Sequence, residues 1–286
     1  MTPLDYDYLR KLVRTRSGLA LGNEKKYLVE SRLLPVVRRA GVDDISALVR
    51  KLRAGDAEQL IVDVVDAMAT KETFFLRDKV PFEQLRSVIL PDLLRTRAAR
   101  RRIRIWCAAC STGQESYSVA MTIKELGDRL SGWKVEIIAT DLSSEVLDRA
   151  RAGVYSQFEV QRGLPIQMLI KYFNQVGEMW EVSPVIRAMV RHQRLILVDD
   201  FSRLGVFDLV FYRNVLIYVD QETKADILAR VARVTDPTGY LILGSAETVV
   251  GLAEAWKPHD AHRGLFTLAK PNLLPPRMSV LGGARA

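Results

Sequence analysis

The stretch from residue 103 to residue 126 constrains the fold more than any other part of the chain. An apolar run, Ile103 to Ala108, is typical of a buried strand. Small residues follow from Ala109 to Gly113, and then apolar side chains at helical spacing, beginning at Tyr117. In such a strand–turn–helix unit the first N–H groups of the helix face a ligand, and small side chains let the ligand approach the backbone. The stretch therefore predicts a ligand site.

The chain beyond this stretch alternates between strand and helix patterns. Strands are expected at 133–140, 207–212, 239–244 and 264–269, and helices at 143–152 and 221–234. This alternation predicts an α/β fold in which helices cover both faces of a parallel sheet. Residues 153–198 interrupt it, and the patterns at 180–183 and 185–197 predict a small antiparallel β insertion.

Residues 1–78 are expected to form a separate domain of short helices, residues 79–270 the α/β domain, and residues 271–286 a disordered tail. The helical domain is basic, because residues 1–53 hold twelve Lys/Arg and six Asp/Glu. This excess supplies most of the net charge of +8. One interpretation is a solvated helical face; the other is a docking surface for an acidic partner.

Composition excludes several classes of protein. No apolar run is long enough to span a bilayer, and the N-terminal residues lack a signal-peptide core. Two cysteines cannot stabilise a chain of 286 residues by disulfides, so a cytoplasmic location is expected. Six arginines between Arg95 and Arg104 are not interleaved with aromatics, and no nucleic-acid motif accompanies them. They predict a solvated link into the first strand and no nucleic-acid partner.

Two adjacent aromatic residues, Phe74 and Phe75, stand near the boundary between the two domains, close to Arg77. They are compatible with a hydrophobic plug that closes the helical domain and leaves the charges outside. They are equally compatible with a lid, in which the rings cover a ligand and Arg77 reaches into the site. The sequence alone does not separate these two interpretations.

The chemistry of the expected site follows from where the strands end, because ligands of parallel sheets bind at the carboxyl ends of the strands. The turn Ala109–Gly113 ends one strand, and Asp141 ends the next. An acidic residue at this position can bind both hydroxyls of a ribose. The turn does not match the dinucleotide motif Gly-x-Gly-x-x-Gly, so a nucleoside without pyrophosphate is favoured. S-adenosylmethionine is the commonest cofactor of this kind.

A rival interpretation uses the same residues. Trp106-Cys107-Ala108-Ala109-Cys110 matches the Trp-Cys-x-x-Cys motif of thiol–disulfide oxidoreductases. That fold would be much shorter, and it would need neither Asp141 nor the N-terminal helices. A zinc site lacks a second pair of cysteines or a close pair of histidines, so no metal is expected. Cys107 and Cys110 are therefore interpreted as packing residues of the turn.

Several segments, in consistent order, resemble the bacterial chemotaxis receptor methyltransferases of the CheR type. Cys110–Ser118 is similar to the family's Gly-Cys-Ser-Thr-Gly-Glu-Glu-Pro-Tyr-Ser, and Phe211–Tyr218 to its Phe-Cys-Arg-Asn-Val-Met-Ile-Tyr. Thr70–Arg77 resembles its Asn-x-Thr-x-Phe-Phe-Arg segment, Thr140-Asp141 its ribose site, and Gly244–Glu247 its Gly-x-Ser-Glu turn.

The resemblance implies a class I, Rossmann-like methyltransferase domain behind an all-α N-terminal domain. It implies transfer of a methyl group from S-adenosylmethionine to glutamates on chemoreceptor helices, which gives methyl esters and S-adenosylhomocysteine in chemotaxis adaptation. The partners implied are receptor helices at the basic N-terminal domain and, as an open question, a receptor tail peptide at the β insertion. Membrane insertion is not expected.

The resemblance also implies roles for individual residues. Arg77 and Tyr218 are the expected catalytic residues, with Phe74, Phe75 and Tyr218 as walls and Arg77 orienting the cofactor or substrate. The residues expected to bind the cofactor are Lys71, Thr73, Arg77, Ala109, Gly113, Glu115, Asp141, Ile196, Leu197, Arg213 and Asn214.

The sequence departs from the family pattern at several of these positions. Lys71 stands in place of Asn, Gln114 in place of Glu, and Ile196 where an Asn commonly precedes Leu. Ala109 also replaces Gly, Ser116 replaces Pro, and Tyr212 replaces a Cys and is expected in the core. The departures motivate an alternative function, a regulatory or receptor-binding module that binds S-adenosylmethionine without turnover.

Overall fold

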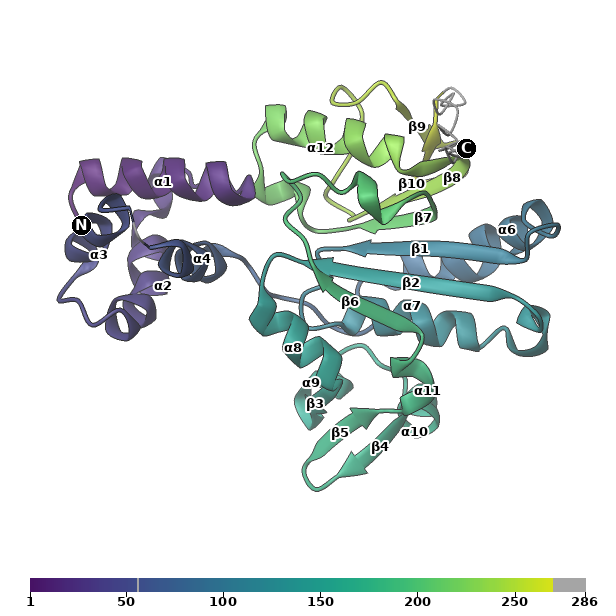
Figure 1. Cartoon of the computed structure of the whole chain (residues 1–286). Helices are drawn as coiled ribbons and strands as arrows, with labels where there is room; N and C mark the ends of the chain where they lie inside the picture. Colours follow the sequence, from purple (N-terminus) through teal and green to yellow (C-terminus); the bar gives the residue numbers. More distant parts are fainter. Residues whose placement is uncertain (56, 270–286) are drawn as a thin grey trace, which may run out of the picture.

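The computed structural model describes residues 1–55 and 57–269. A helical domain lies to one side of an α/β domain, to which a small β insertion is attached (Figure 1). The helices of the first domain are α1 (Pro3–Ser17), α2 (Lys26–Arg39), α3 (Ile45–Arg53) and α4 (Glu58–Met68), with the 3-10 turn η1 (Asn23–Lys25) before α2. Their apolar stripes meet in one core, which includes Leu9, Leu33, Leu48 and Val64.

The α/β domain is built on a seven-stranded sheet with the order β6-β2-β1-β7-β8-β10-β9. The strands are β1 (Arg102–Ala108), β2 (Lys134–Asp141), β6 (Val190–Arg194), β7 (Phe207–Tyr212), β8 (Thr235–Leu243), β9 (Trp256–His259) and β10 (His262–Leu268). The first five in spatial order, β6 to β8, run parallel, so their carboxyl ends meet at one edge. This edge is where the sequence predicted a ligand.

Alternate residues of β1 enter different cores because successive strand side chains point to opposite faces. Ile105 packs on the face covered by α7 (Gln114–Lys124) and α8 (Ser144–Ala152), whereas Trp106 packs on the face of α12 (Gln221–Arg233). The first face also receives α5 (Val80–Gln84), a π-helical turn (Leu85–Ile89) and α6 (Leu90–Thr96). The predicted two-sided helical cover is therefore present.

The prediction of a wholly parallel sheet was wrong at its C-terminal end. Strand β10 pairs antiparallel with β8 at Phe266 and Leu241, and β9 pairs antiparallel with β10. The chain between β8 and β10 contains β9 and no helix, and antiparallel pairs need no crossover helix. Three further 3-10 turns connect elements of this domain: η3 (Gly127–Leu130), η4 (Ser202–Leu204) and η5 (Leu216–Tyr218).

The antiparallel insertion is smaller than the predicted range of 153–198. Its sheet has the order β3-β5-β4, with β3 (Val154–Ser156), β4 (Phe173–Val176) and β5 (Met179–Val182). It carries the helices α9 (Gln157–Gln161), α10 (Ile166–Tyr172) and α11 (Pro184–Arg187). The pattern at 185–197 contains β6, which pairs parallel with β2 in the main sheet. Because β6 is an edge strand of the main sheet and carries polar side chains, its sequence pattern does not distinguish it from a strand of the insertion.

The arginines that precede β1 are not a simple solvated link, as the sequence suggested. Arg97 is buried, and its Nε lies 2.7 Å from Asp208 Oδ1 and its Nη2 2.7 Å from Asp236 Oδ1. Arg100 joins the same two carboxylates. This network ties the chain before β1 to β7 and β8.

None of the helices in the described ranges is long and apolar enough to cross a membrane. The predicted disordered tail, 271–286, lies outside the described residues.

The helical domain is attached to the α/β domain by its own backbone. Leu19 forms an antiparallel bridge with Val219, and the N–H of Ala20 donates to the Tyr218 carbonyl at 2.8 Å. Close by, Arg14 Nε lies 2.7 Å from Asp220 Oδ2. The segment after α1 therefore lies directly against the segment that follows β7.

Candidate functional site

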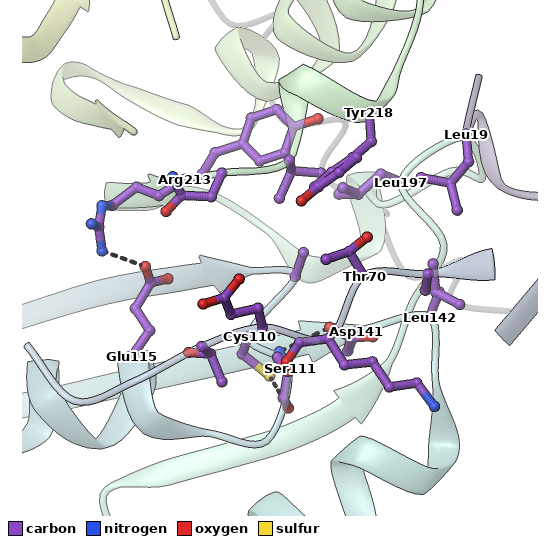
Figure 2. Close-up of a pocket in the computed structure, with 18 of the residues that line it drawn as sticks. Leu19, Thr70, Cys110, Ser111, Glu115, Asp141, Leu142, Leu197, Arg213 and Tyr218 are labelled. Carbon is purple, nitrogen blue, oxygen red and sulfur yellow. Dashed lines mark hydrogen bonds and ion pairs between the residues drawn. The ribbon is translucent and has the colours of Figure 1, made fainter. Parts of the chain in front are cut away.

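A cavity lies where the carboxyl ends of β1, β2 and β7 meet the segments that enter from the helical domain (Figure 2). In this view Asp141 and Ser111 lie at the floor, Tyr218 and Leu197 lie opposite, and Arg213 and Glu115 face each other at one end. The sequence-predicted residues that line the cavity are Lys71, Thr73, Arg77, Ala109, Glu115, Asp141, Leu197, Arg213, Asn214 and Tyr218. Residues far apart in the sequence thus meet at the predicted edge.

The turn after β1 is an unusual piece of backbone. Ala109 and Ser111 adopt left-handed conformations, with φ of 60° and 51°, and Gly113 has φ of 93°. Such conformations are costly for residues with a side chain and are concentrated at ligand sites. Gly113 itself does not line the cavity; a Cβ there would lie 3.0 Å from Ala150 Cβ. Its role is to let the turn pack closely against α8.

Asp141 is held by the turn that it faces. Its Oδ2 accepts from the Ser111 N–H at 2.9 Å, and its Oδ1 accepts from the Ser143 N–H at 3.0 Å. Burial raises the pKa of Asp141, and these two hydrogen bonds only partly offset that effect. The carboxylate has lone pairs to spare for two further donors, such as vicinal hydroxyls of a sugar.

At the other end of the cavity, Arg213 is almost fully buried, with 1% of its side chain exposed. Its Nη1 lies 2.9 Å from Glu115 Oε2, and its Nη2 lies 2.8 Å from Asp78 Oδ2. Nη2 also donates to the Arg77 carbonyl at 2.7 Å. Burial raises the pKa of Glu115, and the neighbouring guanidinium counteracts part of that rise. Arg213 therefore holds the segment that carries Arg77.

Lys71 lines the cavity, but its ammonium group bonds elsewhere. Its Nζ lies 3.0 Å from Asp66 Oδ2 on α4 and 2.8 Å from Glu145 Oε2 on α8. Burial alone would lower the pKa of Lys71, but the two carboxylates outweigh burial and raise it. The residue that replaces the family's Asn is therefore an ionic link between the two domains.

The two expected catalytic residues, Arg77 and Tyr218, both line the cavity. Arg77 donates from Nη1 to the Glu72 carbonyl at 3.0 Å, and its guanidinium lies 5.5 Å from the Phe74 ring centroid. Tyr218 comes from η5, beyond the end of β7. The adjacent carboxylate, Asp78, pairs with Arg213.

Neither interpretation of the aromatic pair, plug or lid, holds for the two rings. Phe75 is fully buried in the core of the α/β domain, edge-on to Tyr155 and Phe173, so it does not close the helical domain. Phe74 lies below the guanidinium groups of Arg77 and Arg162. Neither ring lines the cavity, so the expectation that they form its walls was wrong.

One other expected residue lies outside the cavity, and several lining residues were not anticipated. Ile196 borders a neighbouring groove with Leu142, whereas Leu197 turns into the cavity. Ser17 and Leu19 reach the cavity from the helical domain, which no local pattern indicated. Residues lining the cavity that were not predicted also include Thr70, Cys110, Ser111, Leu142, Leu195, Tyr212, Val215 and Val219. Ser111 was recognisable from its place in the turn.

The thiols do not form a redox centre. Cys107 and Cys110 are both buried and free, and burial raises the pKa of each well above its usual range. A reactive cysteine needs the opposite shift, because the thiolate is the nucleophile. Within residues 1–55 and 57–269, no group of three or more His, Cys, Asp or Glu side chains is arranged to hold a metal ion.

Comparison with protein families matches both domains. Residues 71–264 match the CheR methyltransferase, SAM binding domain, and residues 4–69 match the CheR methyltransferase, all-alpha domain. Chemotaxis protein methyltransferase Cher2 of Pseudomonas putida is 38% identical over 273 residues, which cover 93% of this chain and 98% of the relative. Chemotaxis protein methyltransferase 1 of Pseudomonas aeruginosa is 40% identical over 274 residues, with the same coverage of both chains.

Among solved structures, the chain resembles the glycopeptide N-methyltransferase MtfA complexed with S-adenosylmethionine. The TM-score is 0.32 and the identity is 18%, and the alignment covers 52% of this chain and 51% of MtfA.

Proposed function

Because the chain belongs to the CheR methyltransferase family, we propose that it methylates glutamate side chains of chemoreceptors, using S-adenosylmethionine as methyl donor. Methylation with this cofactor, in chemotaxis, is what the family and its relatives establish. The choice of glutamate, and of ester formation, is our inference. The observation that carries it is a cavity lined by the Asp141 carboxylate together with Arg77 and Tyr218. The cytoplasmic location stays a prediction.

The residues of the cavity fit S-adenosylmethionine. Asp141 presents a carboxylate at the end of β2 for the ribose hydroxyls, and Leu142, Leu195 and Leu197 provide an apolar wall for the purine. The hydroxyl of Tyr212 is buried at the cavity and has no hydrogen-bond partner among the described residues. When bound, the cofactor supplies a methyl group on a sulfonium, which is electrophilic without further activation.

Methyl transfer to a carboxylate requires little of the protein beyond correct positioning of the two reacting groups. A glutamate with a pKa near ~4.3 is already ionised at neutral pH and needs no general base. A carboxylate that attacks a sulfonium methyl loses charge towards the transition state, so alignment and exclusion of water carry most of the rate. An arginine that gripped the substrate carboxylate too tightly would stabilise the ground state. We therefore assign Arg77 and Tyr218 to orientation of the reacting groups.

The decisive experiment is incubation of the protein with S-adenosylmethionine carrying a labelled methyl group and with receptor-enriched membranes from the same organism. We expect label on the receptor that is released by mild alkali, as methyl esters are. Glutamine at the acceptor position should abolish it. If the protein binds the cofactor but labels no receptor, the alternative of a binding module without turnover replaces the proposed function.

Replacing Asp141 by alanine should weaken the binding of S-adenosylhomocysteine about 10- to 150-fold, because charge-assisted hydrogen bonds contribute about 1.5–3 kcal/mol. The affinity of the wild-type protein for S-adenosylhomocysteine should also fall on acidification, when Asp141 becomes protonated. Because burial raises the pKa of Asp141, this loss should begin at a higher pH than it would for an exposed aspartate. Titration calorimetry measures both effects. Asp148→Ala, an exposed position on α8, is the matched control. Unchanged affinity in Asp141→Ala would refute the ribose assignment.

The basic helical domain is proposed as the receptor-docking surface. If so, methylation should slow as salt rises, because exposed charges are screened within ~10 Å at 0.1 M ionic strength. Charge reversal at Arg38 and Arg39, which are exposed at the end of α2, should raise the KM for receptor and leave cofactor binding unchanged.

Arg32 is left intact in this test, although it belongs to the same basic set. It donates to the Met68 carbonyl at 2.5 Å and to Thr70 Oγ1 at 3.3 Å, so its loss would disturb the link between the domains. Charge reversal at Arg129 and Arg203, both exposed on the α/β domain, controls for net charge. Equal rates at low and high salt, with no effect of the α2 variant, would favour the solvated-face interpretation.

The β insertion is proposed as a second contact, for a receptor tail peptide. Strand β4 is an edge of its three-stranded sheet, and Val176 and Met179 are exposed beside it. An edge strand offers unpaired backbone groups to an extended peptide. Methylation of a receptor with and without its C-terminal residues tests this contact.

A further inference from the structure

The turn that follows β8 carries a carboxylate with four backbone partners. Glu247 Oε2 accepts from the N–H groups of Gly244 and Asn214, both at 2.8 Å. Its Oε1 accepts from the N–H groups of Val215 at 2.8 Å and Leu216 at 2.7 Å. Three of the four donors are the successive N–H groups of Asn214, Val215 and Leu216, and Leu216 begins η5, which ends at Tyr218. The Glu247 carboxylate thus takes the place of the β7–β8 backbone hydrogen bonds at the point where the two strands separate.

The last ladder pair before this point joins Tyr212 with Leu243. Beyond it, Asn214 adopts a left-handed conformation with φ of 59°, which lets three successive N–H groups converge on one anion. The approach is close, since a Cβ on Gly244 would lie 2.8 Å from Glu247 Oε2. The left-handed backbone is unfavourable for a non-glycine residue, so it persists only where the surroundings fix it.

We infer that Glu247 is a positioning residue for methyl transfer: its carboxylate fixes the Asn214–Leu216 backbone and thereby sets where Tyr218 stands at the cavity. This inference rests on the proposed function. Glu247 does not line the cofactor cavity, whereas Asn214, Val215 and Tyr218 do. Its effect on the site is therefore indirect, through the backbone that these residues share. The floor around Asp141 is built from β2 and the turn after β1, and the four groups that donate to Glu247 belong to neither.

A graded series of variants tests the inference. Glu247→Gln keeps one of the two carboxylate oxygens and should lower kcat about 10-fold, the effect of losing charge-assisted hydrogen bonds. Glu247→Ala loses all four acceptor contacts and should lower kcat about 100-fold, because misplacement of a reacting group by about 1 Å has that cost. The dissociation constant for S-adenosylhomocysteine should stay within a few-fold in both. Glu254→Ala, exposed in the same loop region, is the control.

Amide hydrogen exchange gives a readout that does not depend on turnover. Protection of the peptide spanning residues 213–218 should fall in Glu247→Ala and remain at the wild-type level in Glu254→Ala. Wild-type kcat in Glu247→Ala per folded molecule, or unchanged exchange in that peptide, would overturn the inference. Failure of the wild-type protein to methylate any receptor would instead refute the proposed function, and the exchange experiment would still decide whether Glu247 orders the segment.

Discussion

Replacing Arg213 by methionine is expected to lower the free energy of unfolding by about 3–5 kcal/mol, the usual cost of removing one partner from a buried ion pair. The substitution leaves the Glu115 carboxylate buried without the guanidinium 2.9 Å away. It also removes the donor to the Arg77 carbonyl, so the segment that carries Arg77 loses its anchor. Activity should be lost together with stability. Chemical denaturation measures the first effect and methyl transfer the second.

The destabilisation should depend on pH in a defined direction. Without Arg213, burial raises the pKa of Glu115 further above its value of about 4.5 in the unfolded chain. A carboxyl with a raised folded-state pKa binds its proton more readily when folded, so stability falls as pH rises above the unfolded value. The variant should therefore be least impaired in mild acid and most impaired at neutral and alkaline pH.

Two controls distinguish the effect of breaking the Arg213–Glu115 ion pair from a general effect of removing an arginine. Arg95→Met removes a pair with Asp92 in which the arginine side chain is 75% exposed, and it should cost less than about 1 kcal/mol. The double variant Arg213→Met with Glu115→Gln should recover part of the stability, because no buried charge remains unpaired. Equal destabilisation in Arg213→Met and Arg95→Met would contradict the buried-pair argument.

Tyr218→Phe and Arg77→Ala should each lower kcat by about 10²-fold, since loss of a positioning contact can have that effect. Both residues line the cavity, and neither belongs to β2 or to the turn after β1, which form its floor. The cofactor dissociation constant should therefore stay within a few-fold of wild type. Calorimetry and initial-rate kinetics on the same preparations measure the two quantities.

Exposed residues of the same types provide matched controls for these variants. Tyr27→Phe changes a tyrosine that is 81% exposed on α2, and Arg129→Ala changes an exposed arginine of η3. Neither should alter kcat. If Tyr218 only packs against the start of α12, the Tyr218→Phe variant would turn over at the wild-type rate.

Local sequence patterns were sufficient for the elements and for the floor of the site. Strand β7 has the predicted bounds, Phe207–Tyr212, and α8 lies within the predicted helix at 143–152, capped by Ser143, whose Oγ accepts from the Val146 N–H. These features depend on side-chain periodicity and on groups a few residues apart. Asp141 was predicted for the same reason, as the acidic residue at the end of a buried strand.

The features that could not be predicted from the sequence depend on contacts between residues that are far apart in the chain. The orientation of β10 and the membership of β6 are decided by which strand edge each one finds. Lys71 was expected at the cofactor, but Asp66 and Glu145 bind its ammonium group, and Glu145 is far from it in sequence. The role of Glu247 was equally hidden, because three of its four donors lie 31 to 33 residues earlier.

The bridge between Leu19 and Val219 limits how the chain can be divided. The two family matches separate near residue 70, yet the wall of the cavity includes Leu19, whose neighbour Ala20 donates to the Tyr218 carbonyl. A fragment that begins at the second match would lack this wall and leave the η5 backbone unpaired on one side. Chimaeras that test the helical domain as the receptor-docking surface should therefore keep Gly18–Leu21 with the α/β domain, and graft only the helices around it.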